Sequence, residues 1–355
     1  MIRWNAATTQ LSSYAPRVEN VPIDLRLDHN ECPPLTDTPA LNVDADLALA
    51  AASYPSRDKV VQQIAERLNV DTANILLSCG GDDIITRCCQ AVLDEQSNAI
   101  TTTPTFEMIP RSMNIAGASI SSIEWTDASS PVDAILDAAD NNTKPIAIVS
   151  PNNPTGATLD AASIRRIART RPESLILADL AYIEFADEDP TQELLEEPNI
   201  VVVRTFSKAF GLAGLRTGYA VASPEIIAAL ARIGSPYPVS ALSLEWLSAV
   251  LNWPQLEDAL ARRVERVAME REAIATQLQS IGCRVLDSQA NFVLAFPPDP
   301  ERLENAFLDA GIAVRAFKGS TTLDGACRIS CPCTEEGLER VQTVLSQLAP
   351  TEISA

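Results

Sequence analysis

Four short polar segments in this sequence each follow or end an apolar run that is typical of a buried strand. They are SCGGDD at 78–83, SPNNPTG at 150–156, ADLAY at 178–182 and TFSKAF at 205–210. In an open α/β sheet, ligands bind beyond the carboxyl ends of the strands. These segments would bring Lys208, the carboxylate of Asp179 and a pair of glycines to one edge. One such segment could be an ordinary turn, but four on one edge indicate a cofactor site.

These residue types suit pyridoxal 5′-phosphate (PLP). A lysine amine can form a Schiff base with the cofactor's aldehyde, a carboxylate can pair with its pyridinium nitrogen, and N–H groups at a helix start can hold its phosphate. Lys208 is one of only four lysines and stands eight residues before Arg216. Taken alone, it could also end a solvated loop. The G-x-G-x-x-G turn and the G-x-x-x-x-G-K-[ST] loop that would indicate nucleotide binding are absent.

Composition and charge disfavour several other classes of function. The 355-residue chain has a net charge of −20, which argues against nucleic acid or an anionic membrane as a partner. No apolar run is long enough to span a membrane, and the first ten residues lack the apolar region of a signal peptide, so we expect a cytoplasmic protein. We expect the eight cysteines to be reduced and predict no metal site, since His29 is the only histidine. Whether the acidity reflects a saline habitat stays open.

The order of apolar runs and helical patterns predicts the elements that position these residues. Strands expected at 74–79, 99–103, 118–125, 145–150, 174–179, 199–206 and 218–223 alternate with helices. This alternation is typical of a mostly parallel sheet covered on both faces. A long helix at 257–282 and later short strands predict a compact α+β unit. We therefore expect a large domain at 46–254 and a small domain at 255–355. The proline-rich arm at 1–45 is expected to be irregular and to pack on the small domain or a partner subunit.

The motifs together resemble those of the fold-type I PLP-dependent aminotransferases (class I/II). The resemblance rests on N-P-T-G at 153–156, D-x-A-Y at 179–182, S-K-A-F-G-L-A-G-L-R at 207–216 and CRIS at 327–330. It is closest to the histidinol-phosphate aminotransferases, through LDHNECP at 27–33, GGDD at 80–83 and GIAVRAF at 311–317. The resemblance covers nearly the whole chain. It implies an α/β fold in which a large domain has a mostly parallel seven-stranded sheet, a smaller α+β domain, PLP as cofactor, and a homodimer.

The resemblance also implies the residues of the cofactor site. Lys208 would bind the cofactor and move the proton at the substrate's Cα, and Asp179 would keep the pyridine nitrogen protonated. Asn153 and Tyr182 would hydrogen-bond the cofactor's phenolic oxygen. The phosphate would be held by the backbone of Gly81 and Asp82 and by the side chains of Thr205, Ser207 and Arg216. Phe106 would stack on the ring, and Tyr54 would reach the phosphate of the neighbouring subunit.

For the substrates, the resemblance implies L-histidinol phosphate as amino donor and 2-oxoglutarate as acceptor, giving imidazole acetol phosphate and L-glutamate. Arg328 would clamp the α-carboxylate, and Tyr14, Asn30 and Arg315 would form a substrate-phosphate site with help from Arg328. Departures from the family pattern in NECPPL and CRISCPC lie near the substrate entrance and leave the substrate open. The alternatives are an aromatic or other amino-acid aminotransferase, a threonine-phosphate decarboxylase, and a non-catalytic ligand-binding relative.

Overall fold

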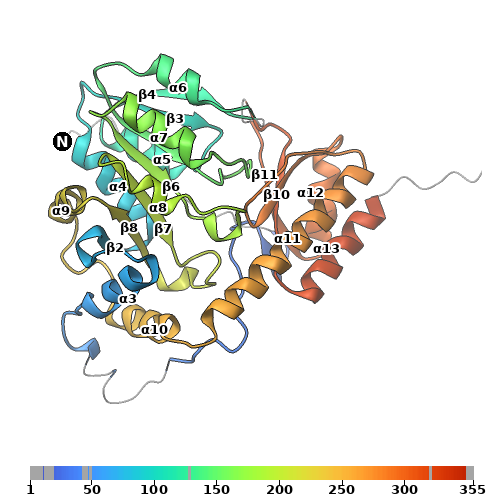
Figure 1. Cartoon of the computed structure of the whole chain (residues 1–355). Helices are drawn as coiled ribbons and strands as arrows, with labels where there is room; N and C mark the ends of the chain where they lie inside the picture. Colours follow the sequence, from blue (N-terminus) through green and yellow to red (C-terminus); the bar gives the residue numbers. More distant parts are fainter. Residues whose placement is uncertain are drawn as a thin grey trace, which may run out of the picture.

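The computed structural model describes residues 11, 20–41, 47, 50–126, 129–319 and 322–348. Two sheets organise these residues, a large one formed by the middle of the chain and a small one formed mainly by its last hundred residues (Figure 1). Tyr14, one of the predicted substrate residues, lies outside the described residues. No helix in the described ranges is both long enough and apolar enough to cross a bilayer.

The large sheet has seven strands in the order β2-β8-β7-β6-β5-β3-β4. Its strands are β2 (Ile75–Ser78), β3 (Asn98–Thr103), β4 (Ser119–Glu124), β5 (Thr143–Val149), β6 (Leu175–Asp179), β7 (Ile200–Thr205) and β8 (Gly218–Ala222). The five strands from β7 to β4 run parallel, whereas β8 is antiparallel to both β7 and β2. The expected mostly parallel α/β sheet is therefore confirmed.

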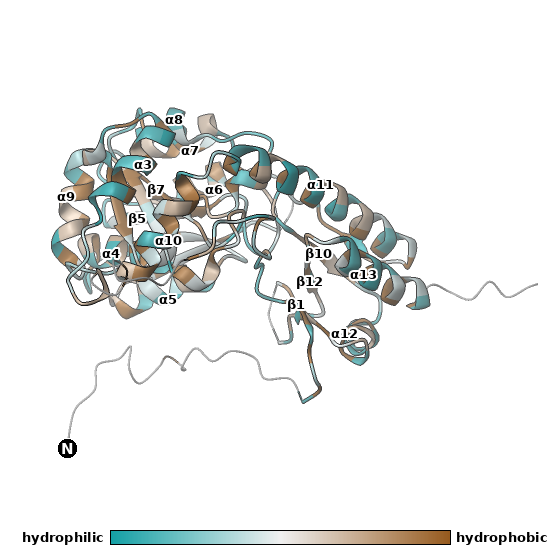
Figure 2. Cartoon of the chain, turned by 90° about the horizontal axis from the view of Figure 1, so that it is seen from below, coloured by the Kyte–Doolittle hydropathy of each residue, from teal (hydrophilic) through white to brown (hydrophobic). Residues whose placement is uncertain are grey.

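Helices cover both faces of the large sheet because its central strands are apolar on both sides. In β5, Ile146 and Ile148 face one core, and Ala147 and Val149 face the other. The second core is completed by α4 (Gly80–Val92), α5 (Met108–Ile115) and α9 (Pro224–Ile233). The first is completed by α3 (Asp58–Leu68), α6 (Val132–Ala138), α7 (Ala161–Thr170), α8 (Thr191–Leu194) and α10 (Ala241–Leu251). Figure 2 shows brown strands such as β7 between helices that carry teal residues.

The small sheet has the order β1-β11-β12-β10-β9. Its strands are β1 (Leu25–Leu27), β9 (Arg284–Val285), β10 (Phe292–Phe296), β11 (Ile312–Ala316) and β12 (Cys327–Ser330), and it packs on α12 (Pro300–Asp309) and α13 (Glu335–Leu348). Helix α11 (Leu256–Ser280) joins the two sheets (Figure 1). Its residues Leu260 and Val267 pack in the first core of the large sheet, and Ile274 and Leu278 pack in the core of the small sheet. The long helix expected here is present.

The N-terminal segment differs from the expectation in one place. We expected it to be irregular, but Leu25–Leu27 forms β1, which pairs in parallel with β11 of the small sheet. Leu27 is buried in the core of that sheet. Three residues are too few for a periodic pattern, so this strand is defined by its pairing with β11, which the local sequence does not reveal. The pairing holds the following residues, 28–34, beside the edge of the large sheet.

Candidate active site

A pocket lies at the carboxyl ends of β5, β6 and β7 and beside the start of α4, where the polar segments were expected to meet. It is lined by Gly81, Asp82, Ile85, Phe106, Val149, Asp179, Ala181, Tyr182, Val203, Thr205, Ser207, Lys208 and Arg216. Every predicted cofactor residue except Asn153 and Tyr54 is in this set. The structure therefore brings together residues that are up to 135 positions apart, from Gly81 to Arg216, through the parallel order of the strands.

Lys208 extends into this pocket from the turn after β7. Its Nζ donates a hydrogen bond to the backbone oxygen of His29 at 3.1 Å and lies 5.4 Å from the centroid of the Tyr182 ring. The side chain is half-buried. Lys208 thus presents its amine inside the pocket, in contrast to the solvated loop end that the local sequence also allowed.

Asp179 is the last residue of β6 and is almost fully buried, with 3% of its surface exposed. One carboxylate oxygen accepts a hydrogen bond from the Ala181 N–H at 3.1 Å. Burial raises the pKa of Asp179 to about 7, aided by the negative charge of Asp82 and opposed by the Ala181 N–H and the positive charge of Lys208. A buried carboxylate with so high a pKa gains stability from a cationic hydrogen-bond donor, and a protonated ring nitrogen is such a donor.

The start of α4 and the end of β7 surround the opposite end of the pocket. A side chain on Gly218 of β8 would place its Cβ 2.7 Å from backbone atoms of Gly80 and Gly81, so the close approach of α4 requires glycine there. The Thr205 hydroxyl lies 3.0 Å from that of Ser207. Backbone N–H groups at a helix start and clustered hydroxyls are suitable ligands for a phosphate.

Arg216 adds a positive charge to this end of the pocket. Its Nη2 lies 3.2 Å from a carboxylate oxygen of Asp82, and half of its side chain is exposed. Its backbone has a φ of +50°, in the left-handed region, where a non-glycine residue is uncommon. Its Nη1 also donates to the backbone oxygen of Ala213 at 3.3 Å. An exposed guanidinium with one exposed carboxylate partner can exchange that carboxylate for a phosphate.

A buried hydrogen-bond network starts at the hydroxyl of Tyr182. This oxygen accepts from Nδ2 of Asn30 at 3.0 Å and from Nδ2 of Asn153 at 3.3 Å. Oδ1 of Asn153 in turn accepts from Nη1 of Arg328 at 2.6 Å, and Oδ1 of Asn30 accepts from Ser330 Oγ at 2.8 Å. The network joins the large sheet, the N-terminal segment and β12 of the small sheet.

Two arginines face each other on neighbouring strands of the small sheet. Arg315 of β11 is the register partner of Arg328 of β12, so their side chains leave the same face of the sheet. Arg328 is buried, its Nη2 donates to the backbone oxygen of Asp28 at 2.5 Å, and its Nε has no hydrogen-bond partner. Burial lowers the pKa of Arg328, and the positive charge of Arg315 acts in the same direction.

Arg315 itself has no carboxylate partner among the described residues. Its guanidinium lies 5.8 Å from the centroid of the Phe317 ring. Asp324, the acid that could have neutralised it, instead accepts a hydrogen bond from the Gly319 N–H at 2.7 Å. Two arginines with unused donors, on one face of the sheet, are suited to anionic groups of a substrate.

Three residues of the site were not predicted. They are His29 and Asp28, which contribute only backbone oxygens, and Ser330, which holds Asn30. Backbone acceptors leave no signal in residue type, so spacing could not have found the first two. Ser330 follows Arg328 by two positions on one strand, and this period places both on the same face. The spacing of Arg328 and Ser330 could therefore have predicted that Ser330 faces the site.

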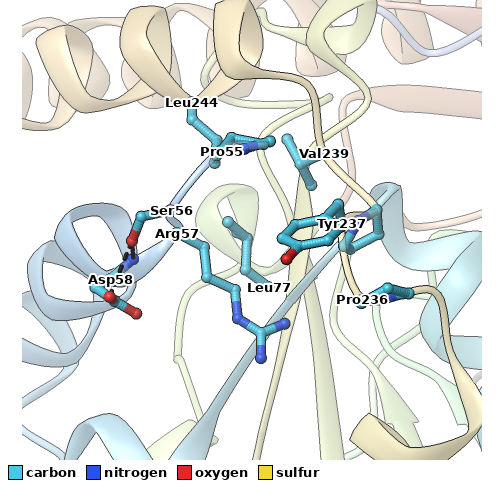
Figure 3. Close-up of a pocket in the computed structure, with 10 residues that line it drawn as sticks. Pro55, Ser56, Arg57, Asp58, Leu77, Pro236, Tyr237, Val239 and Leu244 are labelled. Carbon is cyan, nitrogen blue, oxygen red and sulfur yellow. Dashed lines mark hydrogen bonds between the residues drawn. The ribbon is translucent and has the colours of Figure 1, made fainter. Parts of the chain in front are cut away.

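Tyr54 lies outside the pocket. Its side chain is 80% exposed and its ring stacks on that of Tyr237 with the centroids 4.4 Å apart. A hollow next to this pair is lined by residues that include Arg57, Leu77 and Tyr237 (Figure 3). Exposed, stacked aromatic side chains beside a hollow are typical of an interaction surface.

No cluster of three or more His, Cys, Asp or Glu side chains in the described ranges has a geometry that could hold a metal ion. The pocket offers the amine of Lys208, the carboxylate of Asp179 and anion-binding groups. These residues fit PLP: Asp179 is a buried carboxylate suited to the ring nitrogen, and the start of α4 is suited to the phosphate.

Comparison with known proteins gives a family and several relatives. Residues 18–345 match the family described as aminotransferase class I and II. An aromatic amino acid aminotransferase from Mycobacteroides abscessus is 34% identical over 87% of this chain and 90% of its own length. A histidinol-phosphate aminotransferase from Ruminiclostridium cellulolyticum is 31% identical over 92% of this chain and 94% of its own length.

Among solved structures, a histidinol-phosphate aminotransferase from Sinorhizobium meliloti in complex with pyridoxal-5′-phosphate has the same fold. The TM-score is 0.83 at 22% sequence identity, over 98% of this chain and 99% of that one. This likeness covers both sheets and the helix between them.

Proposed function

Because the chain belongs to the class I and II aminotransferases and is a PLP-dependent transaminase, we propose that it transfers the amino group of L-histidinol phosphate to 2-oxoglutarate. The products are imidazole acetol phosphate and L-glutamate. The observation that carries this proposal is the pairing of Arg315 with Arg328 on one face of the small sheet.

The pocket residues have matching roles in holding the cofactor. Asp179 would pair with the ring nitrogen, Tyr182 and Asn153 would hydrogen-bond the phenolic oxygen, and Phe106 would pack on the ring. The phosphate would be held by the N–H groups of Gly81 and Asp82 and by the side chains of Thr205, Ser207 and Arg216. When bound, PLP supplies an electron-withdrawing ring that accepts the electrons of the bond broken at the substrate's α-carbon.

Lys208 is the residue that we propose to move the proton. Its amine would hold the cofactor in the resting enzyme. Nζ would act as general base and then general acid, taking the proton from the substrate's α-carbon and giving it back within the same half-reaction. The His29 backbone oxygen, 3.1 Å from Nζ, accepts a hydrogen bond and so orients the amine. The Tyr182 ring, 5.4 Å away, limits the space into which the amine can turn.

The two arginines explain how one pocket could accept both substrates in turn. Histidinol phosphate carries a dianionic phosphate one carbon away from the amine-bearing carbon and has no carboxylate. 2-Oxoglutarate carries a carboxylate next to its keto carbon and a second one further along. The unpartnered Nε of Arg328 and the unpaired guanidinium of Arg315 can serve these anions in both half-reactions. Asn30, held by Ser330, would add a hydrogen bond to the phosphate.

The second candidate is an aromatic amino acid aminotransferase, and the 34% identical relative of that name favours it. An aromatic amino acid needs one arginine for its carboxylate and an apolar pocket for its ring. As the amino donor, it leaves Arg315 without an anion to bind in the first half-reaction. The two candidates therefore differ in what they require of Arg315.

A substrate comparison tests the proposal directly. The purified holoenzyme would be assayed with 2-oxoglutarate and either L-histidinol phosphate, L-histidinol, L-phenylalanine or L-tyrosine. We expect kcat/KM to be highest for histidinol phosphate and at least tenfold lower for histidinol, which lacks the phosphate. Higher activity with phenylalanine or tyrosine than with histidinol phosphate would favour the second candidate. Release of CO2 from a phosphorylated amino acid would indicate a decarboxylase.

We also propose that the enzyme is a cytoplasmic homodimer with shared sites. Tyr54 is exposed and outside the pocket of its own chain, so it is free to reach a neighbouring subunit. Its ring stacks on that of Tyr237, so the loop before α3 and the loop before α10 form one surface. The hollow beside Tyr237, between the loop before α3 and the loop before α10, can receive a segment of the partner (Figure 3).

A further inference from the structure

Two cysteines that the proposed reaction does not use lie together beside the candidate active site. The sulfur atoms of Cys32 and Cys333 are 3.5 Å apart, although the residues are 301 positions apart in the chain. Cys32 follows β1 in the N-terminal segment, and Cys333 follows β12 in the loop before α13. Both thiols are free, Cys32 is buried and Cys333 is partly exposed. Two thiols in contact can be oxidised to a disulfide, and Cys32, the more buried of the two, keeps 7% of its surface exposed.

The surroundings of Cys32 favour a thiolate. Nδ2 of Asn291 lies 3.5 Å from its sulfur. Arg263 is buried next to it and donates to the backbone oxygen of Pro34 at 2.9 Å. The S–H of Cys333 donates to Cys32 and lowers the pKa of the Cys32 thiol. Burial opposes this shift, and the positive charges of Arg263 and Lys208 support it.

The other cysteines of this region are poor competitors. The hydrogen bond to Cys32 raises the pKa of Cys333, so this residue keeps its proton. Burial raises the pKa of Cys331 well above its usual range. Cys331 also packs in the core of the large sheet, and its S–H donates to the Val267 oxygen. The contacts at Cys32, together with the directions of the two pKa shifts, therefore favour Cys32 as the nucleophile and Cys333 as the neighbour that holds a proton.

We propose that Cys32 and Cys333 are a redox-sensitive pair that closes to a disulfide when the protein meets a hydroperoxide. In the first step, the Cys32 thiolate attacks one peroxide oxygen and the O–O bond breaks. Cys32 becomes a sulfenic acid, and the other oxygen leaves as an alcohol, or as water from hydrogen peroxide, after taking a proton from solvent. In the second step, the Cys333 sulfur attacks the Cys32 sulfur, and hydroxide leaves with the Cys333 proton as water. Two thiols lose two electrons, and the peroxide gains them.

The disulfide would act on the active site through two neighbours. Asn30, two residues before Cys32, donates to the Tyr182 hydroxyl, and Arg328 lies on the strand that leads to Cys333. A disulfide bond is about 2 Å long, so the two sulfurs must approach each other by roughly 1.5 Å. This movement pulls the segment that carries Asn30, and we expect it to weaken the Asn30 contact with Tyr182. Oxidation should therefore lower kcat/KM reversibly.

Peptide mapping of the peroxide-treated holoenzyme tests the disulfide itself. Tryptic cleavage gives residues 27–57, with Cys32 as the one cysteine, and residues 329–340, with Cys331 and Cys333. After treatment with hydrogen peroxide and alkylation of the remaining thiols, we expect these peptides to be linked and two fewer thiols to be alkylated. Fragmentation before Pro332 separates the two cysteines of the second peptide and should place the link on Cys333.

Matched variants and an activity readout complete the test. Cys32→Ser and Cys333→Ser should each abolish the link, whereas Cys283→Ala, which changes a buried cysteine of the small-sheet core, should retain it. The ratio of kcat/KM after and before peroxide should fall at least twofold in the parent protein, recover with dithiothreitol, and stay near one in Cys333→Ser. A link through Cys331, or sulfinic acid on Cys32 without any link, would overturn the proposal. An unchanged kcat/KM in fully linked protein would overturn its effect on the active site.

Discussion

Nη1 of Arg328 donates a hydrogen bond of 2.6 Å to Oδ1 of Asn153, and this contact joins the small sheet to the edge of the large one. The same Asn153 side chain donates from Nδ2 to the hydroxyl of Tyr182. One amide therefore holds both the arginine proposed to bind substrate and the tyrosine proposed to bind cofactor. Because one orientation of this amide satisfies both contacts, we expect a displacement of Arg328 to disturb the hydrogen bond to Tyr182.

Replacing Asn153 should affect both partners. In Asn153→Ala, Nη1 of the buried Arg328 loses its acceptor and Tyr182 loses one of two donors. A hydrogen bond to a charged group contributes about 1.5–3 kcal/mol, so we expect kcat/KM to fall roughly tenfold to a hundredfold. Steady-state assays with both substrates would measure this loss. As a control, Asn74→Ala removes a half-buried amide that donates to the Ala222 oxygen, away from the pocket, and should leave kcat/KM within about twofold of the parent. Equal losses in the two variants would contradict the role of Asn153.

The raised pKa of Asp179 predicts a pH-dependent stability for the cofactor-free protein. Its pKa is raised from 3.8 in the unfolded chain to about 7, so the folded protein binds the proton more tightly than the unfolded one. The contribution of Asp179 to the free energy of unfolding therefore falls as the pH rises from about 4 to about 7. A shift of this size corresponds to a few kcal/mol, on the order of 4. Asp179→Asn should remove this loss and make the cofactor-free protein more stable than the parent at pH 8.

Chemical denaturation of the cofactor-free proteins at pH 5 and pH 8 would measure this effect. Asp160→Asn is the matched control. Hydrogen bonds from Ser163 lower the pKa of Asp160, so its carboxylate stabilises the folded protein at pH 8. The free energy of unfolding of Asp160→Asn at pH 8 should therefore not exceed that of the parent. Asp179→Asn should also bind PLP more weakly, because the ring nitrogen loses its anionic partner. A variant that is no more stable than the parent at pH 8 would show that Asp179 is not a buried, uncompensated carboxylate.

Much of this site could be predicted from the sequence, because its chemistry follows the ends of apolar strands. The runs that became β5, β6 and β7 are buried on both faces and therefore read as continuous apolar segments. Polar residues directly after such runs, Asp179 and Lys208 among them, had to lie at one sheet edge.

The contacts from the N-terminal segment could not be predicted in this way. Its strand β1 has three residues, and its partner β11 lies almost three hundred residues later. The contacts that follow from this pairing join Asn30 to Tyr182 and Cys32 to Cys333, and no local pattern encodes them. The role of Tyr54 could not be predicted from one chain for a different reason. Its ring is exposed on a single chain, so a role in the pocket depends on a second subunit.

Lys208 should be the residue that carries the cofactor. Reduction of the holoenzyme with borohydride, followed by peptide mapping, should place the label on Lys208, because its amine is the one lysine amine among the pocket-lining side chains. Lys208→Ala should lower kcat by several orders of magnitude and leave the fold unchanged by circular dichroism. Lys318→Ala is a suitable control, because the exposed Lys318 forms an ion pair with Glu304 of α12, and neither residue lines the pocket. Label on Lys59, Lys144 or Lys318 would refute the assignment.

The shared-site homodimer predicts complementation between two inactive variants. Tyr54→Ala removes the residue proposed to reach the neighbouring phosphate, and Lys208→Ala removes the amine. A mixed dimer holds one site that has lost both residues and one site that has kept both. Mixing the variants under conditions of subunit exchange should therefore restore up to about a quarter of the parent activity, since half of the dimers are mixed and each has one intact site. Sedimentation should show a dimer. A monomer, or no recovered activity after verified exchange, would count against the shared site.

Arg315 should decide between a phosphorylated and an unphosphorylated amino donor. Its guanidinium has no carboxylate partner among the described residues and shares one face of the small sheet with Arg328. Arg315→Ala should lower kcat/KM for histidinol phosphate roughly tenfold to a hundredfold, since a charge-assisted hydrogen bond of about 1.5–3 kcal/mol is lost. The kcat/KM for phenylalanine, which has no phosphate, should change by less than about threefold. Arg315→Lys keeps the charge without the fork geometry and should be intermediate.

A matched arginine in the same sheet separates this role from packing. Arg284 of β9 is exposed and lies over the ring of Phe296 at 3.8 Å, as Arg315 lies over Phe317 at 5.8 Å. Arg284→Ala removes a comparable contact with an aromatic ring and should leave kcat/KM for both amino donors unchanged. If Arg315→Ala instead lowers kcat/KM for histidinol phosphate and for phenylalanine by the same factor, Arg315 supports the structure of the sheet. Equal losses would argue against a contact between Arg315 and the phosphate, because only histidinol phosphate carries that group.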